Sequence, residues 1–578
     1  MAARVETPWN SLPSMLFDLA RRTPDRPMLR FWRDGGWRVV SWADFARRTA
    51  AVAAGLRTAG VSPGDRVLLV SESRPEFNIA DAALMAVGAV TVPTYSTNLP
   101  SDHAHVLRDS GARAAIVSTP TLAAKVLAGA AEAGGLDLLV CMDGAPTEAP
   151  PQGTRLAAWT ALEGAPGYLP MLMAECEQIP AGRLACLIYT SGTGGSPKGV
   201  MLPHRAMLAN RAGLATALER LSLDGTPYLS FLPLSHSYEH TVGCFLLPSL
   251  GMEVVYSRGA ERLAAEMAEV RPTILTAVPR LFEVLRTRML AQVEKDGGLK
   301  RRLFERTLDF GLRKLDGAPL GLLERAQDLV LDRLVRNKVR ARFGGRMVGM
   351  VCGGARLDPD LSGFFLALGL PVLQGYGQSE AGPVISVNLP WHNDRRTVGA
   401  PLPGVEARIA EDGEILIRGE LVMDGYWNDP ASTDRALVRP AAGEAPWLHT
   451  GDVGRLDEGR LTVTDRKRDF IKTLGGDMVS PAKIEGLLMA EPEIAQAVAA
   501  GEGQPAIVAI LVAAEGMEAK LDDAVKRVNA RLSAFERIRR WLPAPAFSVE
   551  NGLLTPTMKV KRRLVIERYG REIATLGR

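Results

Sequence analysis

Strand-like and helix-like patterns alternate along the first 141 residues. Ser41 precedes a helical pattern in which Phe45, Val52 and Leu56 share one face, and Gly60 follows the end of that pattern. Short apolar runs indicate strands and a further pattern indicates a helix: strands at 66–70, 89–92, 114–117 and 136–141, and a helix at 76–87. Because alternating strands and helices are typical of parallel sheets covered by helices, we expect a doubly wound α/β unit.

A second series of apolar runs follows a weakly periodic stretch. Residues 144–180 are rich in Pro, Gly and Ala, and we interpret them as a surface excursion between two such units. The second unit begins with the apolar run 184–189. Its further strand-like runs lie within 228–236, 252–257, 273–279, 346–355 and 371–380.

A long charged helical insert, 281–343, interrupts the second unit. It is amphipathic, and its end is basic. We interpret it as a solvated helical hairpin over the sheet, while contact with a membrane surface stays a hypothesis, since basic amphipathic helices are only suggestive.

The pattern changes again after residue 395. Short β runs with turns at 413–427 and 459–472 indicate a small β-barrel-like subdomain. Ser480 and Pro481 have the residue types of a helix N-cap and first helical position. Two apolar runs, at 495–500 and 506–513, and a helical pattern over 521–535 follow. These signals predict a small α+β domain at the C-terminus.

Size and composition narrow the class of protein. A chain of 578 residues is too long for one hydrophobic core, so we expect at least two domains. A net charge of only +4 predicts no nucleic-acid partner. The five cysteines are scattered without a CxxC pair, which favours reduced thiols over a disulfide or zinc framework. The N-terminus has no pattern of a secretion signal, and the most apolar stretch, 241–256, is broken by Pro248 and Glu253, so we expect a cytoplasmic protein.

The stretch 189–200, YTSGTGGSPKGV, has the composition of a phosphate-binding loop. Its glycines let the backbone turn tightly around an anion, and its hydroxyl side chains add donors. Lys198 adds a positive charge, so the loop is a plausible cradle for a triphosphate. The ordinary nucleoside-triphosphatase loop requires Gly-Lys followed by Ser or Thr. This loop has Pro197, Lys198 and Gly199 at those positions, so it does not belong to that class.

Two later segments lie at the ends of apolar runs and contain residues that could contact a base or a metal ion. Gly353 to Ala355 closes one run, and Gly375 to Glu380 closes another. Since carboxyl ends of parallel strands line the ligand crevice of an open sheet, we expect both segments to face the phosphate loop. Tyr376 offers a ring to stack on a base, and Glu380 offers a hard oxygen ligand for Mg²⁺.

Together these motifs resemble the adenylate-forming (AMP-binding) superfamily, which includes acyl-CoA synthetases, luciferases and peptide-synthetase adenylation domains. The loop departs from the usual signature only at Gly194, where a threonine is expected. Within this superfamily, the sequence resembles the long-chain fatty acyl-CoA synthetases in particular, over roughly residues 10–565. The segments that carry this finer resemblance are PLSHSYEH (233–240), VPRLFE (278–283), QGYGQSEAGPVISVN (374–388) and 447–485.

The resemblance implies a role for individual residues. The implied nucleotide-binding residues are Thr190, Ser191, Gly192, Thr193, Gly194, Lys198, Gly354, Ala355, Gln374, Gly375, Tyr376, Gly377, Ser379, Asp452, Arg466 and Lys559. The implied catalytic residues are Lys559, Lys198, Glu380, Thr190 and His236, and Glu380 is also the implied Mg²⁺ ligand. Arg468 matches the hinge position, usually Asp or Lys, and Lys472, Gly475 and Gly476 match the loop used in thioester formation.

The family's fold and chemistry follow as expectations. The fold would be α/β, with two doubly wound sheets and a β-barrel-like subdomain in a large domain (1–467) and a mobile α+β domain (468–578). The reaction would be Mg²⁺- and ATP-dependent formation of an acyl-AMP with release of pyrophosphate, followed by thioester formation with coenzyme A. Three alternatives stay open: an acyl-AMP ligase that loads a carrier protein, a coenzyme A ligase for medium-chain or aromatic acids, and a catalytically inactive homologue.

Overall fold

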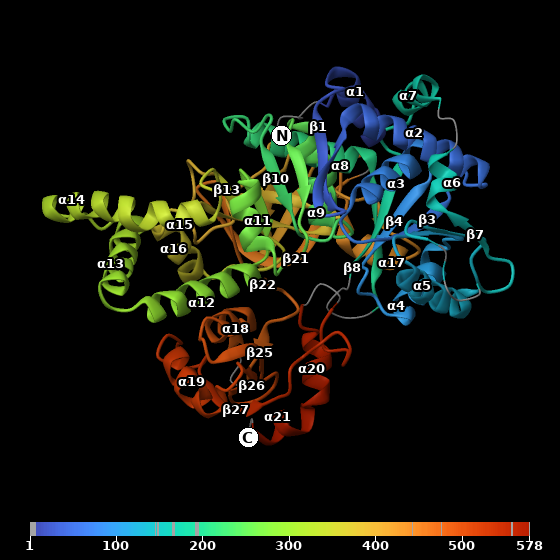
Figure 1. Ribbon diagram of the computed structural model, residues 1–578. Coiled ribbons are helices and arrows are strands. Elements are labelled where there is room, and N and C mark those ends of the chain that lie inside the picture. Colours follow the sequence, from blue (N-terminus) through green and yellow to red (C-terminus); the bar gives the residue numbers. More distant parts are fainter. Residues whose placement is uncertain are drawn as a thin grey trace.

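Two large mixed sheets form the centre of the N-terminal part of the chain (Figure 1). The computed structural model describes residues 7–144, 146, 150–164, 168–190, 196–441, 443–474, 477–555 and 559–576. The eight-stranded sheet has the order β19-β9-β8-β4-β3-β5-β6-β7. Its strands are β3 (Arg66–Val70), β4 (Val90–Thr94), β5 (Ala114–Val117), β6 (Leu138–Cys141), β7 (Arg155–Ala158), β8 (Leu184–Thr190), β9 (Lys198–Pro203) and β19 (Gly425–Tyr426).

The nine-stranded sheet has the order β16-β15-β14-β13-β12-β10-β11-β1-β2. Its strands are β1 (Pro27–Arg33), β2 (Gly36–Ser41), β10 (Pro227–Ser230), β11 (Glu253–Tyr256), β12 (Ile274–Ala277), β13 (Gly349–Cys352), β14 (Val372–Gly377), β15 (Val384–Val387) and β16 (Ala400–Pro401). The central strands are parallel, and the added edge strands are antiparallel.

Helices cover both faces of the eight-stranded sheet, as the predicted parallel unit requires. In β3, Val67 and Leu69 pack in one hydrophobic cluster with α2 (Trp42–Thr58) and α3 (Pro75–Ala86). Leu68 and Val70 pack in another with α4 (Pro100–Ser110) and α5 (Pro120–Ala133). Successive strand residues point to opposite faces, so an unbroken apolar run fits a strand buried on both sides. The predicted cap of α2 is present, because the Ser41 hydroxyl accepts the Asp44 N–H.

The sheets are not two consecutive units, which corrects the sequence interpretation. The phosphate-loop strand β8 pairs with β4 in the first sheet, while the N-terminal hairpin β1–β2 joins the second sheet beside β11. Residues 144–180 are also more than an excursion. They contain the edge strand β7 and two helices, α6 (Trp159–Glu163) and α7 (Leu169–Glu177). Strand partners are chosen by tertiary packing, which a local pattern does not encode.

The insert is helical, as predicted, and projects sideways from the sheets (Figure 1). It consists of α12 (Pro279–Asp296), α13 (Gly298–Leu315), α14 (Leu322–Leu331), the π-helical turn η2 (Asp332–Arg336) and α15 (Asn337–Arg342). The helices α1 (Leu12–Arg22), α8 (His204–Ala217), α9 (Ser237–Thr241), η1 (Val242–Leu246), α10 (Leu247–Ser249), α11 (Leu263–Val270) and α16 (Pro359–Ala367) complete the cover of the two sheets.

A curled antiparallel sheet follows, as the short β runs predict. Its strands are β17 (Glu406–Ile409), β18 (Glu414–Arg418), β20 (Leu437–Val438), β21 (Trp447–Asp457) and β22 (Arg460–Arg466), and α17 (Pro430–Ala436) packs against it. This half-barrel completes the predicted α/β architecture of the N-terminal part.

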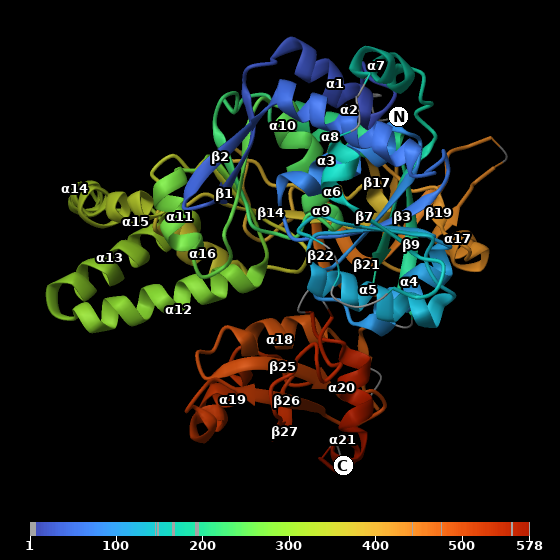
Figure 2. The same cartoon turned by 45° about the vertical axis from the view of Figure 1, so that its right-hand side comes forward.

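The C-terminal part forms its own lobe below the sheets (Figures 1 and 2). Its elements are β23 (Ile471–Lys472), β24 (Met478–Val479), α18 (Pro481–Met489), β25 (Ile494–Ala500), β26 (Ile507–Ala513), η4 (Glu518–Lys520), α19 (Leu521–Asn529), β27 (Ile538–Pro543), α20 (Arg562–Arg568) and α21 (Gly570–Leu576). Two hydrophobic clusters lie wholly within residues 471–576. The α/β fold class is therefore confirmed, while the domain boundary at 467/468 stays a prediction.

One C-terminal helix is shorter than its pattern predicts. Helix α19 ends at Asn529 rather than near 535, and Phe535 is exposed. The Asn529 amide both donates to the Ile538 carbonyl and accepts the Ile538 N–H, at 2.9 and 2.8 Å, which turns the chain back toward β27. Across the described residues, no helix combines the length and apolar character needed to cross a membrane.

Candidate active site

The phosphate-loop segment connects two strands at the edge of the site. Strands β8 and β9 are antiparallel, and Thr190 lies opposite Lys198 where the two strands leave the sheet. Four of the predicted loop residues, Ser191, Gly192, Thr193 and Gly194, lie outside the described residues. The structure therefore fixes the two ends of the loop, Thr190 and Lys198, beside each other.

Lys198 is held by an acidic partner that sequence reasoning missed. Its Nζ lies 2.9 Å from Oδ2 of Asp429, donates to the Ser432 hydroxyl and lies 5.3 Å from the centre of the Tyr426 ring. The Ser432 hydroxyl and the Lys198 ammonium hold the pKa of Asp429 well below its usual range. A cation is thus positioned at the mouth of the loop.

Glu380 lies next to this cation. It belongs to the short η3 helix (Ser379–Ala381), and its Oε1 accepts a hydrogen bond of 2.8 Å from Tyr426 Oη. The turn before Glu380 requires a glycine at 377, because a Cβ there would lie 2.1 Å from the Pro383 carbonyl oxygen. Tyr426 therefore joins Lys198 and Glu380 in one cluster.

The Glu380 carboxylate fits the predicted Mg²⁺. Its Oε2 accepts no hydrogen bond from a described residue, and carboxylate oxygens are the ligands that Mg²⁺ prefers. No group of three or more His, Cys, Asp or Glu side chains in the described ranges could hold a metal alone. That donor set suits Mg²⁺, which usually takes one or two carboxylates and completes its shell with water and phosphate oxygens.

The predicted ribose site is assembled around Asp452. Tyr376 Oη donates to Asp452 Oδ2 at 2.7 Å, and Arg466 Nε lies 3.7 Å from Oδ1. Asp452 and Arg466 face each other across the β21–β22 ladder. Burial raises the pKa of Asp452, while the Tyr376 hydrogen bond and the Arg466 charge oppose that rise.

The predicted adenine-binding segments end neighbouring strands. Strands β13 and β14 are parallel neighbours, so Gly354 and Ala355 after β13 lie beside Gln374 and Gly375 of β14. Gly354 has a φ of +80°, which favours glycine, and a Cβ on Gly375 would lie 3.3 Å from the Ser386 carbonyl oxygen. Gln374 is buried, whereas Gly354 and Ala355 are exposed.

The residue that follows His236 contacts Ser379, one of the predicted nucleotide-binding residues. Ser237, which follows His236, has its Oγ 2.8 Å from Ser379 Oγ. His236 is half-buried, and its Nδ1 accepts the Tyr238 N–H at 3.2 Å. Burial and then the Lys559 ammonium lower the pKa of His236 to about 3, so the imidazole is neutral at physiological pH.

Lys559 brings the C-terminal lobe to this site. Its ammonium is close enough to His236, Arg466 and Asp452 to share electrostatic interactions with all three. Desolvation and then Arg466 lower the pKa of Lys559 to about 8, while Asp452 opposes the shift. By surface area Lys559 is exposed, so this desolvation comes from protein groups that surround the side chain rather than from close packing.

Two further predicted positions are exposed on the surface. Arg468 is exposed, and its charge reaches Tyr426. Lys472 is also exposed, and its backbone N–H donates to Glu502 Oε2 at 2.9 Å within the C-terminal lobe. Gly475 and Gly476 lie outside the described residues.

Four residues of the cluster were missed by sequence reasoning: Ser237, Tyr426, Asp429 and Ser432. Ser237 contacts Ser379, which is 142 positions away in the chain, and Tyr426 contacts Glu380, which is 46 positions away. Asp429 and Ser432 both contact Lys198, which is 231 and 234 positions away. Nothing local marks such pairs. Only the position of Ser237 beside His236, inside a segment already singled out, offered a signal.

The comparison with known protein families decides the identity of this site. Residues 16–427 match the family described as AMP-binding enzyme, and residues 468–576 match the AMP-binding enzyme C-terminal domain. The chain belongs to the adenylate-forming AMP-binding enzyme family. The superfamily assignment made from the sequence is therefore confirmed.

Relatives of this AMP-binding enzyme are similar over nearly the whole chain. A long-chain-fatty-acid–CoA ligase, FadD15 of Mycobacterium tuberculosis, is 34% identical over 98% of this chain and 97% of its own. Long-chain-fatty-acid–CoA ligase 1 of Homo sapiens is 28% identical over 94% of this chain and 82% of its own.

Solved structures share the fold of this AMP-binding enzyme. The o-succinylbenzoate coenzyme A synthetase of Bacillus subtilis in complex with ATP and magnesium has a TM-score of 0.69 at 20% identity, over 95% of this chain and 98% of its own. The adenylation domain of a carboxylate reductase from Mycobacterium chelonae has a TM-score of 0.73 at 21% identity, over 99% and 92%.

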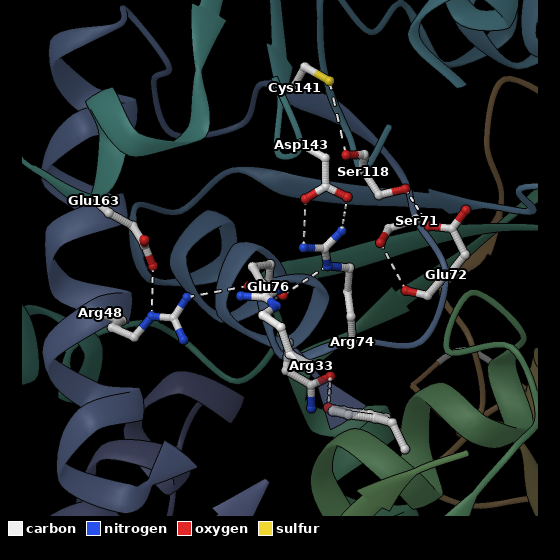
Figure 3. A network of polar contacts seen from close by, with 12 residues as sticks. Arg33, Arg48, Ser71, Glu72, Arg74, Glu76, Ser118, Cys141, Asp143 and Glu163 are labelled. Carbon is white, nitrogen blue, oxygen red and sulfur yellow. Dashed lines mark hydrogen bonds and ion pairs between the residues drawn. The ribbon is translucent and has the colours of Figure 1, made fainter. Parts of the chain in front are cut away.

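A separate cavity of about 640 Å³ lies outside this site, and Figure 3 shows the polar contacts among side chains that line it. Arg74 contacts both Glu76 and Asp143, and Arg33 and Arg48 also approach Glu76. Figure 3 shows these side chains converging from the hairpin β1–β2, helix α2 and the ends of β3 and β6. Since each of these arginines is paired with a carboxylate, we interpret the network as a connection between the two sheets and assign it no part in the reaction of the AMP-binding enzyme.

Proposed function

We propose that the chain is a long-chain fatty acid–CoA ligase that forms AMP, with the crevice around Glu380, Asp452 and Lys559 as its active site. The observation that carries this proposal is the position of Lys559: a lysine from the C-terminal lobe lies beside Asp452, Arg466 and His236 of the N-terminal part. A cation delivered by a second lobe suits a reaction between a carboxylate and a polyphosphate. The preference for long-chain acids is supported by the relatives named above.

The first step joins a fatty acid to ATP. A carboxylate oxygen of the acid attacks the α-phosphorus, the bond from that phosphorus to the bridging oxygen breaks, and pyrophosphate leaves with the electron pair. The obstacle is the approach of an anion to a polyanion. Lys198 and Lys559 would stabilise the charge by position rather than by proton transfer. Mg²⁺, held by Glu380, would supply further neutralisation of the phosphates when bound.

The adenosine half of ATP would be held on the opposite side of the crevice. Asp452 has Oδ1 turned to Arg466 and Oδ2 to Tyr376, so its carboxylate is fixed in one orientation. A fixed carboxylate suits the two ribose hydroxyls, because each of its oxygens can accept a hydrogen bond from them. The end of β14 would then place adenine against the Tyr376 ring.

The neutral His236 and the hydroxyl pair Ser237–Ser379 would lie on the acyl side. A charged imidazolium would form an ion pair with the substrate carboxylate and hinder its attack on the α-phosphorus. A neutral imidazole can orient the carboxylate by a hydrogen bond without this attraction. Ser379 next to Glu380 supplies a hydroxyl donor at the same place. These groups would position the acid for attack.

The second step would use a different arrangement of the lobes. The coenzyme A thiol attacks the acyl carbonyl, and AMP leaves. We propose that the C-terminal lobe turns about Arg468, which withdraws Lys559 and brings Lys472, Gly475 and Gly476 to the site. The exposed position of Arg468 between β22 and β23 is compatible with a hinge.

Two half-reactions test the proposal. Acid-dependent exchange of labelled pyrophosphate into ATP measures the first step, and thioester formation from supplied acyl-AMP measures the second. We expect Lys559→Ala to lose the first and keep the second, and Arg468→Pro to do the reverse. Equal loss of both activities in both variants would contradict the proposal.

The substrate is tested by a panel of acids with hydroxylamine to trap the adenylate. We expect long saturated and unsaturated acids to give more trapped product than medium-chain or aromatic acids. Thioester product with free coenzyme A, and none with a holo carrier protein, is the expected acceptor result. The reverse acceptor preference would instead identify an acyl-AMP ligase that loads a carrier protein.

A further inference from the structure

Helix α14 exposes an apolar stripe on the outer side of the helical insert. Figures 1 and 2 show α14 at the far end of the projecting insert, away from the two sheets. The side of the helix that faces α13 is buried at Asp328 and Leu331. The opposite side of α14, and of the π-helical turn η2 that continues it, carries five large apolar residues with these exposed fractions: Leu322 83%, Leu323 81%, Leu329 74%, Val330 55% and Leu334 45%.

The spacing of these residues places them on one side of the helix. Leu322, Leu329 and Val330 are seven and eight positions apart, two helical turns, so they lie in one row. Leu323 and Leu334 extend that row sideways. None of the five belongs to, or packs against, a hydrophobic cluster formed by the described residues. We call these five residues the outer stripe.

Each acidic residue of this segment is paired with a basic residue. Glu324 pairs with Arg313 at 2.8 Å and Asp328 with Lys314 at 2.9 Å, both on α13. Asp332 pairs with Arg340, further along the same segment, at 2.7 Å. Each of these negative charges is therefore compensated, and none stands alone against an anion that approaches the outer stripe.

The basic residues beside the outer stripe are uncompensated. Arg325, Arg333 and Lys338 are exposed, and within the described ranges none has a carboxylate at ion-pair distance. Long basic side chains can lie along an apolar surface and extend their charge to its edge. The outward side of α14 and its continuation is thus apolar in the middle and cationic at the margins.

We propose that the outer stripe binds the surface of an anionic lipid bilayer. The helix would lie in the plane of the interface, with its leucines at the boundary of headgroups and acyl chains and its basic residues against lipid phosphates. Charge complementarity selects this occupant, because all the unpaired ionic groups around the outer stripe named above are cationic. The inference concerns another surface than the active site and does not rest on the proposed function.

The exposed side of α14 is our reason to propose membrane contact in place of the solvated hairpin. An amphipathic pattern alone does not show whether the apolar side of a helix faces solvent or packs against the rest of the protein. An apolar side that packed against the two sheets would be buried. In the structure, the apolar side of α14 that is not needed for packing points outward. Five exposed large apolar side chains, four on α14 and one on η2, form the kind of contiguous patch that marks an interaction surface.

Sedimentation with vesicles tests the inference on the full-length protein. We expect the protein to pellet with vesicles of equal parts phosphatidylcholine and phosphatidylglycerol, to stay in the supernatant with phosphatidylcholine alone, and to bind less at high salt. The combined substitutions Leu322→Ser, Leu329→Ser and Val330→Ser should weaken binding at least about 10-fold. Arg325→Glu with Arg333→Glu should weaken it to a similar degree.

The matched control changes exposed apolar residues elsewhere. Tyr168 and Met171, at the start of α7, are 68% and 54% exposed and lie on another side of the molecule (Figure 1). The combined substitutions Tyr168→Ser and Met171→Ser should leave vesicle binding unchanged. Thermal unfolding checks that each variant is folded, and the charge-reversal pair serves as the test if the serine variant is not.

Three results would overturn the inference. The first is wild-type protein that stays in the supernatant with both vesicles. The second is equal binding by the wild type and by both outer-stripe variants. The third is a dimer, seen by light scattering without lipid, that the serine substitutions dissociate, because the outer stripe would then be covered by a second copy of the chain.

Discussion

Tyr376 and Asp452, 76 positions apart, are joined by a hydrogen bond of 2.7 Å from the phenol to the carboxylate. One residue ends a strand of the nine-stranded sheet, and the other lies in the half-barrel. Their contact shows that the predicted adenine and ribose sites are parts of one surface. Because the carboxylate is the group that would meet the ribose, the phenol acts mainly by fixing its orientation.

We therefore expect unequal effects from substitutions in this pair. Asp452→Asn should lower kcat/KM for ATP by about 10- to 100-fold, since a hydrogen bond to a charged group contributes roughly 1.5–3 kcal/mol. Tyr376→Phe keeps the ring and loses only the hydroxyl, so its effect should be several-fold smaller. Pyrophosphate exchange at varied ATP concentration measures both. A larger loss in the Phe variant than in the Asn variant would contradict the assignment of Asp452 to the ribose.

The pH dependence of the first half-reaction should reveal Lys559. Its pKa is lowered to about 8 by desolvation and by Arg466, so the ammonium is charged below that pH and neutral above it. If the charged form stabilises the reacting phosphate, kcat/KM for ATP should fall as pH rises through about 8. Values of kcat/KM report the free enzyme, which is the state that the structure describes.

Lys559→Arg is the matched variant for this test, because a guanidinium stays charged throughout the range. We expect it to retain part of the activity and to lose the alkaline fall. An unchanged alkaline fall in the Arg variant would assign the titration to another group.

Removal of the metal should act through Glu380. A chelator should abolish pyrophosphate exchange, and Glu380→Gln should raise the Mg²⁺ concentration needed for half-maximal rate, because an amide is a weaker ligand than a carboxylate. Tyr426→Phe removes the hydrogen bond to Glu380 without removing the ligand, so it should shift the Mg²⁺ requirement much less. A Mg²⁺ requirement that is identical in the wild type and the Gln variant would show that Glu380 does not hold the metal.

Lys198 and Asp429 should affect ATP in opposite directions. Lys198→Ala should lower the rate of adenylation by about 10²- to 10³-fold, the usual loss for one charge-stabilising group. Asp429→Asn removes an anion that competes with the phosphates for the ammonium but keeps a side chain able to cap α17. Since partly exposed ion pairs contribute little, its KM for ATP should fall by up to about 5-fold. A KM that rises in the Asn variant would indicate that Asp429 positions the lysine instead.

Glu239 gives a prediction about stability. Its buried carboxylate accepts hydrogen bonds from Tyr228 and Ser230 at Oε1 and from Thr276 at Oε2, at 2.6, 2.5 and 2.8 Å. Burial nevertheless raises the pKa of Glu239 above its ordinary 4.5. A raised pKa in the folded state means that stability present below pH 4.5 is lost as pH rises through the folded-state value.

Glu239→Gln removes that titration and keeps an acceptor. The free energy of unfolding of the wild type should therefore decline, relative to the Gln variant, as pH increases above 4.5. Glu239→Leu should destabilise by about 1–3 kcal/mol at any pH, because it removes the acceptor of the Ser230 hydroxyl and leaves Tyr228 and Thr276 with only their contact to each other. Denaturant unfolding across a pH series compares the three proteins. A constant difference between wild type and the Gln variant would contradict the raised pKa.

Local signals in the sequence predicted most elements, but not how they assemble. The run at 66–70 became β3 with the predicted bounds because its apolar residues fit a strand buried on both faces. The assignment of β8 to a second unit was wrong, because its pairing with β4 depends on packing between distant segments. The helix predicted over 521–535 is longer than the observed helix α19 for a similar reason, because the contact of Asn529 with Ile538 ends the helix.

The sequence by itself determined which motifs occur and in which order, and hence the family, and it predicted which side chains are reactive. Only the tertiary structure decided which groups act on one another, such as Asp429 with Lys198, Tyr426 with Glu380, and Lys559 with the half-barrel. It also decided that the apolar side of α14 faces outward. The physical reason is that motifs and periodicity are local properties of the chain, whereas an ion pair or an exposed face depends on how distant segments pack.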